Sequence, residues 1–132
     1  AGKYRNVPVR IGGSAFVPAQ PYLVPKLMED VFVFYENNKN LMHPVVLAAE
    51  MHERIVTVHP FIDGNGRTSR LVMNLILLSH GYTIANLKGD NSARLAYYTA
   101  LEKCQVSNEK VNFIELITDT TIESLKEHLE LC

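Results

Sequence analysis

The stretch His59-Pro60-Phe61-Ile62-Asp63-Gly64-Asn65-Gly66-Arg67-Thr68-Ser69-Arg70 decides how this chain folds and what it binds. It combines a histidine, a carboxylate, two glycines around an asparagine, and two arginines. The apolar residues after Arg70 predict a helix, so the glycines are expected at a helix N-terminus. Unpaired backbone N–H groups and the helix dipole favour anions at that position. The stretch therefore predicts a site for a phosphate-bearing ligand.

Each residue type in the stretch suits a magnesium-bound polyphosphate. Gly64-Asn65-Gly66 permits close approach of a ligand to the main chain, and Asn65 can add a side-chain donor. Arg67 and Arg70 are three residues apart, so on a helix they share a face and can both bind phosphate oxygens. Asp63 is an oxygen ligand of the kind that magnesium takes beside phosphates.

His59 is the residue of the stretch whose side chain titrates near neutral pH, which makes it the expected general base. Taken alone, a histidine after a helix is usually structural, and Gly-Asn-Gly is usually a plain turn. The combination favours a functional site. The stretch lacks the P-loop pattern. Zinc held by His52, His59 and Asp63 is an alternative that the absence of a metalloprotease pattern disfavours.

Composition limits the classes of function. The 132 residues are 47% hydrophobic with a net charge of -1, which predicts one globular domain and gives no support for a nucleic-acid or membrane-surface role. No signal peptide and no run of ~20 apolar residues is present. Cys104 and Cys132 lack metal spacing, so reduced thiols are expected. Because the chain has no initiator methionine, we expect a domain excised from a longer protein.

The N-terminal part is the least helical. Val7 to Ile11 and Ala15 to Val17 are predicted as short extended pieces, with Gly12-Gly13-Ser14 as the turn between them. A small β-hairpin is therefore expected over this segment. A proline-rich surface loop is the alternative.

The rest of the chain predicts helices separated by proline, glycine and asparagine. The segment from Leu71 to Leu78 is apolar nearly all round, which predicts a helix at the centre of a bundle, and Gly81 is its expected C-cap. The fold class is all-α with one hairpin. The other expected helices are Pro25 to Tyr35, Pro44 to Val58 or His59, Asn91 to Lys103, and one or two between Phe113 and Leu131.

The central stretch resembles the signature of the Fic family, His-x-Phe-x-Asp/Glu-Gly-Asn-Gly-Arg-x-x-Arg, at every fixed position. Further likenesses extend the resemblance from about Gly2 to the last helix. These are His43-Pro44, Ala48-Ala49, His52, the Leu71-to-Tyr82 helix and Tyr97-Tyr98. The resemblance implies a Fic-type helical bundle with a hairpin flap over residues 1–132.

The resemblance also implies an activity, the transfer of AMP from ATP to a protein hydroxyl with release of pyrophosphate. Carried onto this sequence, His59 would deprotonate the target Ser, Thr or Tyr, and Asp63 would hold Mg²⁺ at the phosphates. Gly64, Asn65 and Gly66 would cradle the phosphates. Arg67 and Arg70 would hold the β- and γ-phosphates and stabilise the leaving charge.

Two further groups of residues take roles from the resemblance. The hairpin at Val9 to Val17 matches the flap that covers the nucleotide and aligns the target, with Ser14, Ala15, Phe16 and Val17 as its ligand-facing part. An extended target could pair with its edge. Adenosine contacts are expected from Tyr97, Tyr98 and Gln105, although paired helical tyrosines are as often core residues.

Many members of the family carry an inhibitory Ser/Thr-x-x-x-Glu helix whose glutamate pairs with the second arginine, here Arg70. No serine or threonine of this chain has glutamate four positions later. The pattern around His43-Pro44 most resembles members with an N-terminal inhibitor. We therefore expect an uninhibited domain whose inhibitory segment lies upstream or on a partner chain, and self-modification follows from that expectation.

Several alternatives stay open at this point. The transferred group could be UMP, or the enzyme could remove AMP from a target, although that reaction would need the inhibitory glutamate. A nucleotide-sensing or toxin–antitoxin interaction domain is the non-enzymatic alternative. A bacterial cytoplasmic location and pairing into a homodimer are further expectations.

Overall fold

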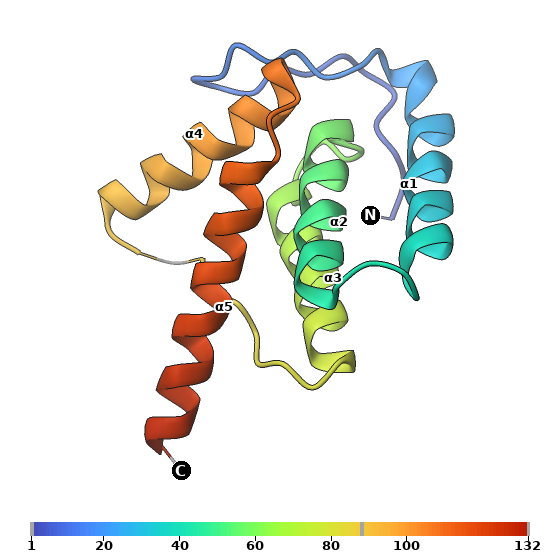
Figure 1. Cartoon of the computed structure of the whole chain (residues 1–132). Coiled ribbons are helices and arrows are strands. Elements are labelled where there is room, and N and C mark those ends of the chain that lie inside the picture. The colour runs from blue at the N-terminus through green and yellow to red at the C-terminus, as the bar shows by residue number, and fades with distance from the viewer. Residues whose placement is uncertain (1, 88, 132) are drawn as a thin grey trace.

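We analysed a computed structural model, in which residues 2–87 and 89–131 are described. These residues form five α-helices and one turn of 3-10 helix (Figure 1). None of them lies in a β-strand, so the predicted all-helical class is confirmed. The helices are α1 (Val24–Asn38), α2 (Pro44–Val58), α3 (Asn65–Ser79), α4 (Asn91–Ser107) and α5 (Val111–Leu131), and the 3-10 turn η1 is Pro21–Leu23.

Proline sets both ends of α2, and its predicted extent is confirmed. Pro44 opens the helix, where a missing N–H costs nothing, and His43 Nδ1 accepts a hydrogen bond from the Val45 N–H at 3.2 Å. Pro60 cannot continue the helix, which ends at Val58. The cap residue His59 then turns the chain in the left-handed region, with φ 53° and ψ 59°. His59, the general base predicted from the sequence, therefore lies at the C-terminal end of α2.

The other helix ends differ from expectation by small amounts. Gly81 has φ 85° and follows the cap residue of α3, and the Tyr82 N–H donates to the Leu77 carbonyl at 2.9 Å. Helix α4 runs four residues beyond its expected end, to Ser107, and Asn108 ends it in the left-handed region. The C-terminal segment forms a single helix.

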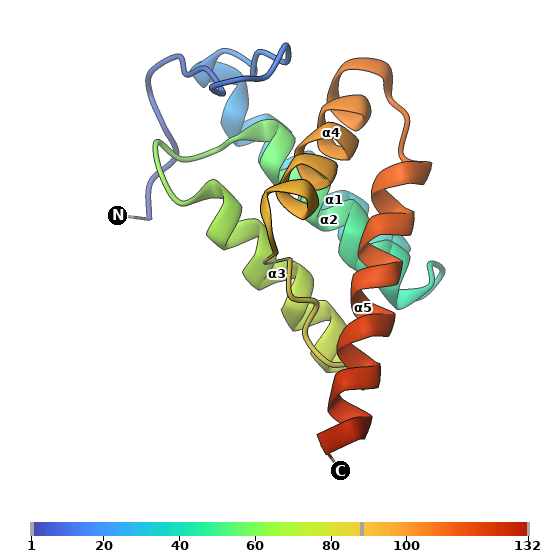
Figure 2. The same cartoon turned by 90° about the vertical axis from the view of Figure 1, so that its left-hand side faces the viewer.

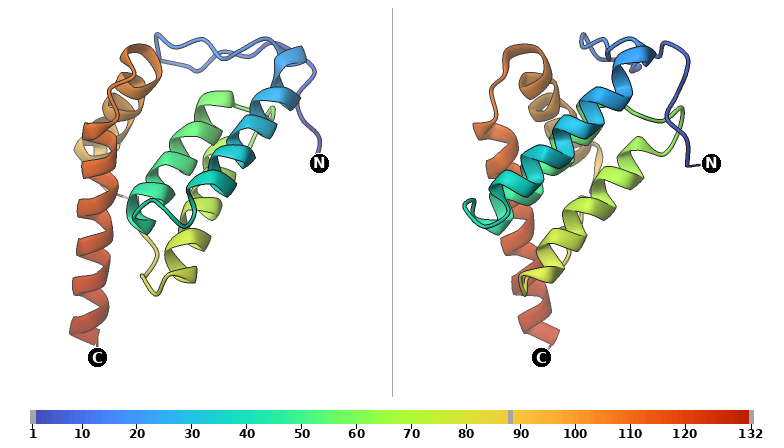
Figure 3. Two further views of the ribbon diagram at one scale, coloured as in Figure 1. Left: turned by 45° about the vertical axis from the view of Figure 1, so that its right-hand side comes forward. Right: turned by 90° about the vertical axis from the view of Figure 1, so that its right-hand side faces the viewer.

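The centre of the bundle is α2 rather than α3. Helix α2 packs against α1, α3, α4 and α5, and most of its residues are buried around the whole circumference. It lies between α1 on one side and α5 on the other (Figure 3). The prediction of a central α3 is wrong, because α2 covers only the side of α3 that carries Met73, Ile76 and Leu77. The other side exposes more than half of each of three leucines, Leu71, Leu75 and Leu78.

The predicted β-hairpin does not form among the described residues. Its turn is present, because the Ser14 N–H donates to the Ile11 carbonyl at 3.2 Å and Gly13 has φ 77°. Its second arm gives its N–H groups to side chains instead of to the first arm. The Ala15 N–H donates to Glu102 Oε1, and the Phe16 N–H donates to Ser14 Oγ. The segment therefore crosses the top of the molecule as a loop (Figure 1); we call residues 9–17 the flap.

The remaining general expectations concern cysteines and membranes. Cys104 is buried and free, and burial raises the pKa of its thiol to about 11. Cys132 lies outside the described residues. Among the described helices none has the length and apolar character that crossing a bilayer requires.

The packing of α3 on α2 predicts a contrast between two leucines on the same helix. Leu77 is fully buried, so Leu77→Ala is expected to lower the free energy of unfolding by about 2–5 kcal/mol. Leu75 faces solvent, so Leu75→Ala is expected to change it by less than about 0.5 kcal/mol. Chemical denaturation followed by circular dichroism measures both. Equal losses would contradict the orientation of α3.

Candidate active site

The imidazole of His59 lies at the junction of α2 and the loop to α3. Its backbone N–H donates to the Ile55 carbonyl at 3.0 Å, which completes the last turn of α2. The side chain is half-buried, and its Nδ1 atom is buried without a hydrogen bond of good geometry to any described residue. One ring nitrogen is thus enclosed by the protein.

Arg5 holds the end of α2, and no sequence pattern predicts this role. Its side chain is 3% exposed, and each hydrogen bond that it donates to a described residue goes to a backbone carbonyl. Nε donates to the His59 carbonyl at 2.6 Å, and Nη2 donates to the Val58 carbonyl at 3.3 Å, so the cation sits at the negative end of the α2 dipole. The remaining bonds go to the carbonyls of Val7 (3.1 Å), Ala19 (2.7 Å) and, from the Arg5 N–H, Pro60 (2.8 Å).

These bonds tie the N-terminal segment to the loop that carries His59. The two run side by side where the chain enters the molecule (Figure 2). Loss of solvent lowers the pKa of His59, and the positive charge of Arg5 lowers it further, while the Val56 carbonyl acts in the opposite direction. The imidazole is therefore neutral at pH 7, which is the form that accepts a proton.

The loop between His59 and α3 is closed by Asn65. Its Oδ1 accepts a hydrogen bond from the Phe61 N–H, and its Nδ2 donates to the Phe61 carbonyl, each at 2.8 Å. The side chain is buried, so the amide is used within the loop. The predicted side-chain donor to phosphate is therefore engaged elsewhere, and Asn65 offers its backbone N–H instead.

The N-terminus of α3 is open to an anion. Gly64 precedes it with φ 85°, and no side chain caps it. The Thr68 N–H donates back to the Gly64 carbonyl at 2.9 Å. The N–H groups of Asn65, Gly66 and Arg67 belong to the first turn, which has no carbonyl partner within the helix. Three backbone donors and the positive end of the helix dipole therefore converge there.

Asp63 and Arg67 flank this terminus as exposed, loosely paired side chains. They are 91% and 75% exposed, and the Asp63 Oδ2 atom lies 3.5 Å from the Arg67 Nη2 atom. An exposed pair at that distance contributes little to stability. Both groups are thus available to a ligand, the carboxylate to a cation and the guanidinium to a phosphate.

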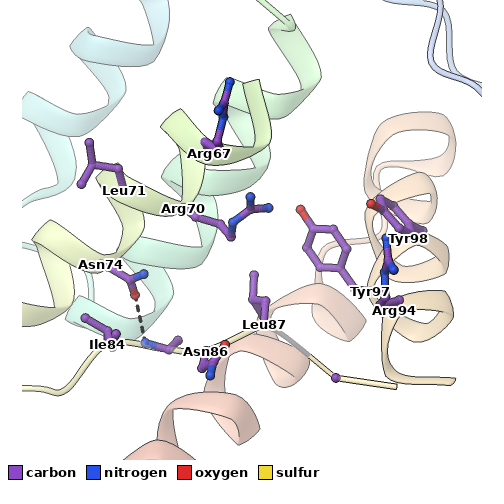
Figure 4. A pocket seen from close by; sticks show the side chains of 12 residues that line it. Arg67, Arg70, Leu71, Asn74, Ile84, Asn86, Leu87, Arg94, Tyr97 and Tyr98 are labelled. Atoms are coloured by element: carbon purple, nitrogen blue, oxygen red, sulfur yellow. Dashed lines mark hydrogen bonds between the residues drawn. The ribbon is translucent and has the colours of Figure 1, made fainter. Parts of the chain in front are cut away.

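Arg70 projects from α3 into an open cleft of about 810 Å³. The cleft lies between α3, the segment Ile84–Leu87 and α4, and Arg70 faces Tyr97 across it (Figure 4). Asn74 fixes the floor, because its Oδ1 accepts a hydrogen bond from the Ala85 N–H at 2.9 Å. Arg67, Arg94 and Tyr98 also line the cleft. Three cations and two aromatic rings therefore border one space beside the open end of α3.

The two tyrosines have different environments. Tyr97 is buried, and its hydroxyl lies 2.6 Å from His52 Nε2. The His52 ring stacks on Phe113, and burial lowers the pKa of His52 to about 4. His52 is thus a neutral interior residue that holds Tyr97. Tyr98 is exposed at the cleft. Within the described part of the chain, no three His, Cys, Asp or Glu side chains gather closely enough to bind a metal ion on their own.

Gln105 does not join the other predicted nucleotide contacts. It lines a second, smaller cavity of about 450 Å³ between α1, α2 and α4, whereas Tyr97 and Tyr98 line the first. The flap residues Ser14 and Ala15 are bound to α4 through Glu102. The structure thus brings His59, the start of α3 and the tyrosine cleft into one region and leaves Gln105 outside it.

Little in the sequence indicates three residues that the structure adds to the site. Arg5, Arg94 and Glu102 stand outside the central stretch, and each has an ordinary surface-type side chain. Arg94 and Tyr98 are four residues apart, so the predicted helix places them on one face. This four-residue spacing is the feature of the sequence that indicates Arg94 beside Tyr98 in the wall of the cleft.

The contact between Arg5 and His59 predicts a pKa change. Arg5→Gln removes a positive charge, so the pKa of His59 is expected to rise toward its ordinary value of about 6.5. Arg5→Lys keeps the charge and is expected to shift it less. Arg10→Gln, at an exposed position of the same segment, serves as the control and leaves the pKa unchanged. Titration of the imidazole by NMR measures all three. An unchanged pKa in Arg5→Gln would rule out the electrostatic effect of the guanidinium.

The sequence is similar to that of one family of known proteins. The model of the Fic/DOC family matches residues 1–77. The protein adenylyltransferase Fic of Aedes aegypti is 39% identical over 132 residues, which cover 97% of this chain and 25% of that protein. The protein of the same name from Drosophila grimshawi is 37% identical over 130 residues, which cover 97% of this chain and 26% of that protein. The chain thus spans about a quarter of the length of these relatives.

The fold agrees with the sequence match. The solved structure of Fic-1 from C. elegans superposes with a TM-score of 0.83 at 28% identity, covering 99% of this chain and 37% of that one. A Fic domain containing signaling protein from Bacteroides thetaiotaomicron gives 0.81 at 30% identity, covering 95% and 53%. With a family model over more than half its length and a common fold, the chain belongs to the Fic/DOC family.

Proposed function

We propose that this domain transfers AMP from magnesium-bound ATP to a hydroxyl side chain of a protein and releases pyrophosphate. The observation that carries the proposal is the placement of a neutral imidazole at the end of α2, one short loop from the open N-terminus of α3. A base and an anion site in that relation suit attack on a phosphate. Membership of a family that includes protein adenylyltransferases supports the choice of reaction.

The chemistry follows from these positions. A proton on the enclosed Nδ1 of His59 leaves Nε2 free to accept the proton of the incoming hydroxyl. The hydroxyl oxygen then bonds to the α-phosphorus, and the bond from that phosphorus to the bridging oxygen breaks. The backbone N–H groups of Asn65, Gly66 and Arg67 stabilise the charge on the phosphates. Catalysis is mostly positioning and electrostatic stabilisation, as in other phosphoryl-type transfers.

Asp63 fits a magnesium ion. Its carboxylate is almost fully exposed, its one ionic contact is a long one, and hard oxygen donors are what magnesium prefers. Mg²⁺, when bound with the nucleotide, neutralises charge on the phosphate oxygens. Asp63 would supply one protein ligand to it, and the phosphates would supply others.

Arg67 and Arg70 would bind different phosphates of the nucleotide. Arg67 is exposed at the first turn of α3, and Arg70 reaches into the cleft. No carboxylate among the described residues pairs with Arg70, so its guanidinium can hold the β- and γ-phosphates. Tyr98 and the wall around Tyr97 then remain for the adenosine.

The flap residues Ser14 to Val17 would face the target. Self-modification, control by an inhibitory segment, a cytoplasmic location and pairing of two copies stay predictions.

Transfer of label tests the proposal. The protein, MgCl₂ and ATP labelled at the α-phosphate are incubated with a cell extract, and protein-bound label is counted on the chain itself and on other proteins. His59→Ala is expected to lose at least about 100-fold of the labelling, because general-base catalysis contributes about 10²–10⁴-fold. His128→Ala, an exposed histidine of α5, is the matched control and should keep full activity.

Three outcomes separate the proposal from its alternatives. Stronger labelling from α-labelled UTP than from ATP would favour UMP as the transferred group. Release of AMP from pre-labelled proteins would favour the reverse reaction. Tight ATP binding with no label on any protein would favour a nucleotide-sensing domain.

The assignment of Arg70 predicts a difference between two nucleotides. Arg70→Ala is expected to weaken ATP binding by about 10- to 100-fold, since a charge-assisted bond is worth about 1.5–3 kcal/mol. AMP binding should change by less than about threefold, because AMP lacks the phosphates assigned to Arg70. Isothermal titration calorimetry with each nucleotide measures the contrast, and Lys126→Ala, at an exposed position of α5, is the surface control. Equal losses for ATP and AMP would contradict the assignment.

A further inference from the structure

The flap is attached to α4 at one point. The Ala15 N–H donates to Glu102 Oε1 at 2.6 Å, and the Ser14 hydroxyl donates to the same oxygen at 3.4 Å. Ser14 Oγ also accepts a hydrogen bond from the Phe16 N–H at 3.1 Å. One carboxylate therefore organises three consecutive residues of the flap.

The attachment to Glu102 matters because the two arms of the flap do not share the backbone hydrogen bonds of a β-hairpin. Its arms are not paired as strands, so backbone bonds between them do not set its position. A bond from an N–H to a carboxylate is charge-assisted and stronger than a neutral one. Val17, the next residue along, is 55% exposed and free to meet a ligand. The location of this face of the flap thus depends on where α4 holds Glu102.

Helix α4 also forms a wall of the cleft. Arg94, Tyr98 and Glu102 follow one another at four-residue steps, so they lie along one face of the helix. Arg94 and Tyr98 line the cleft, and Glu102 holds the flap one turn farther on. The wall of the cleft and the attachment of the flap therefore lie on one helix, and Figure 1 shows the flap crossing the top of the molecule above α4.

We propose that Glu102 is a positioning residue that fixes the flap to α4 and thereby links its position to occupancy of the cleft. A nucleotide that packs on Tyr98 fixes the position of α4 against α3, and the Glu102 carboxylate then fixes Ala15 and Ser14 relative to the nucleotide. The flap then presents Phe16 and Val17 to the target in one register. The link to occupancy rests on the proposed function, whereas the attachment itself does not.

Amide hydrogen exchange, measured by NMR on the whole chain, tests the attachment without any ligand. Glu102→Ala is expected to speed exchange at the Ala15 and Phe16 amides by about tenfold, which is the loss of one such hydrogen bond. Glu102→Gln keeps an acceptor oxygen without the charge and should fall between. Lys103→Ala, an exposed neighbour on α4, is the control and leaves exchange unchanged. Unchanged exchange in Glu102→Ala would overturn the proposal.

Adding Mg-ADP tests the link to the cleft. Exchange at Ala15 is expected to slow in the wild type and not in Glu102→Ala, while the affinity for ADP stays within about threefold in both. Equal slowing in both proteins would show that the flap closes on the nucleotide without Glu102, which overturns the link. If ADP does not bind at all, the proposed function fails and the link with it, and exchange in the unliganded proteins still decides the attachment.

Discussion

The arrangement of the candidate site depends on a buried cation that has no acidic partner among the described residues. The guanidinium of Arg5 gives its N–H groups to main-chain carbonyls, and two of these belong to Val58, the last residue of α2, and to its cap residue His59. Those carbonyls have no partner within their own helix, so leaving them buried without one would be costly. The same bonds stabilise the left-handed conformation of His59, which a residue with a side chain adopts at a cost. The bonds of Arg5 therefore compensate three costs at one place. These are the burial of its own charge, the unpaired carbonyls at the end of α2 and the strained backbone of His59.

From that point the chain turns directly into α3. Asn65 closes the intervening loop by exchanging two hydrogen bonds with Phe61, so the end of one helix and the start of the next keep a fixed relation. Helix dipoles of opposite sense meet there. The C-terminus of α2 is neutralised by Arg5, whereas the N-terminus of α3 is left for an anion. Because Arg5 binds the Val58 and His59 carbonyls, these two groups oppose an anion at α3 less than free carbonyls would.

Much of this could be predicted from local sequence. Pro44 and Pro60 define α2 because proline acts on its own backbone. The central stretch predicts a phosphate site because its residues act together over twelve positions, and that site stays a prediction. The errors lie where distant residues compete for the same groups. Glu102 takes an N–H that the hairpin prediction gave to a strand, and it is 87 residues from Ala15. The part of α3 from Leu71 to Leu78 is apolar nearly all round, yet only contact with α2 decides which side is buried. Arg5 could not be recognised, because its carbonyl partners carry no side-chain signal.

Gly64 and Gly66 also limit which residues can replace them. A methyl group at position 64 would require a strained backbone, with φ at 85°, and at position 66 it would lie 3.2 Å from the Arg70 Nη1 atom. At position 64 any side chain would be strained by the backbone geometry. At position 66 the neighbouring atom belongs to a side chain that can move, so a residue larger than glycine there would shift the Arg70 guanidinium by a few tenths of an ångström without unfolding the helix. Under the proposed function, a substitution at position 66 would thus weaken phosphate binding through Arg70, and a related domain would lose catalysis while keeping its fold.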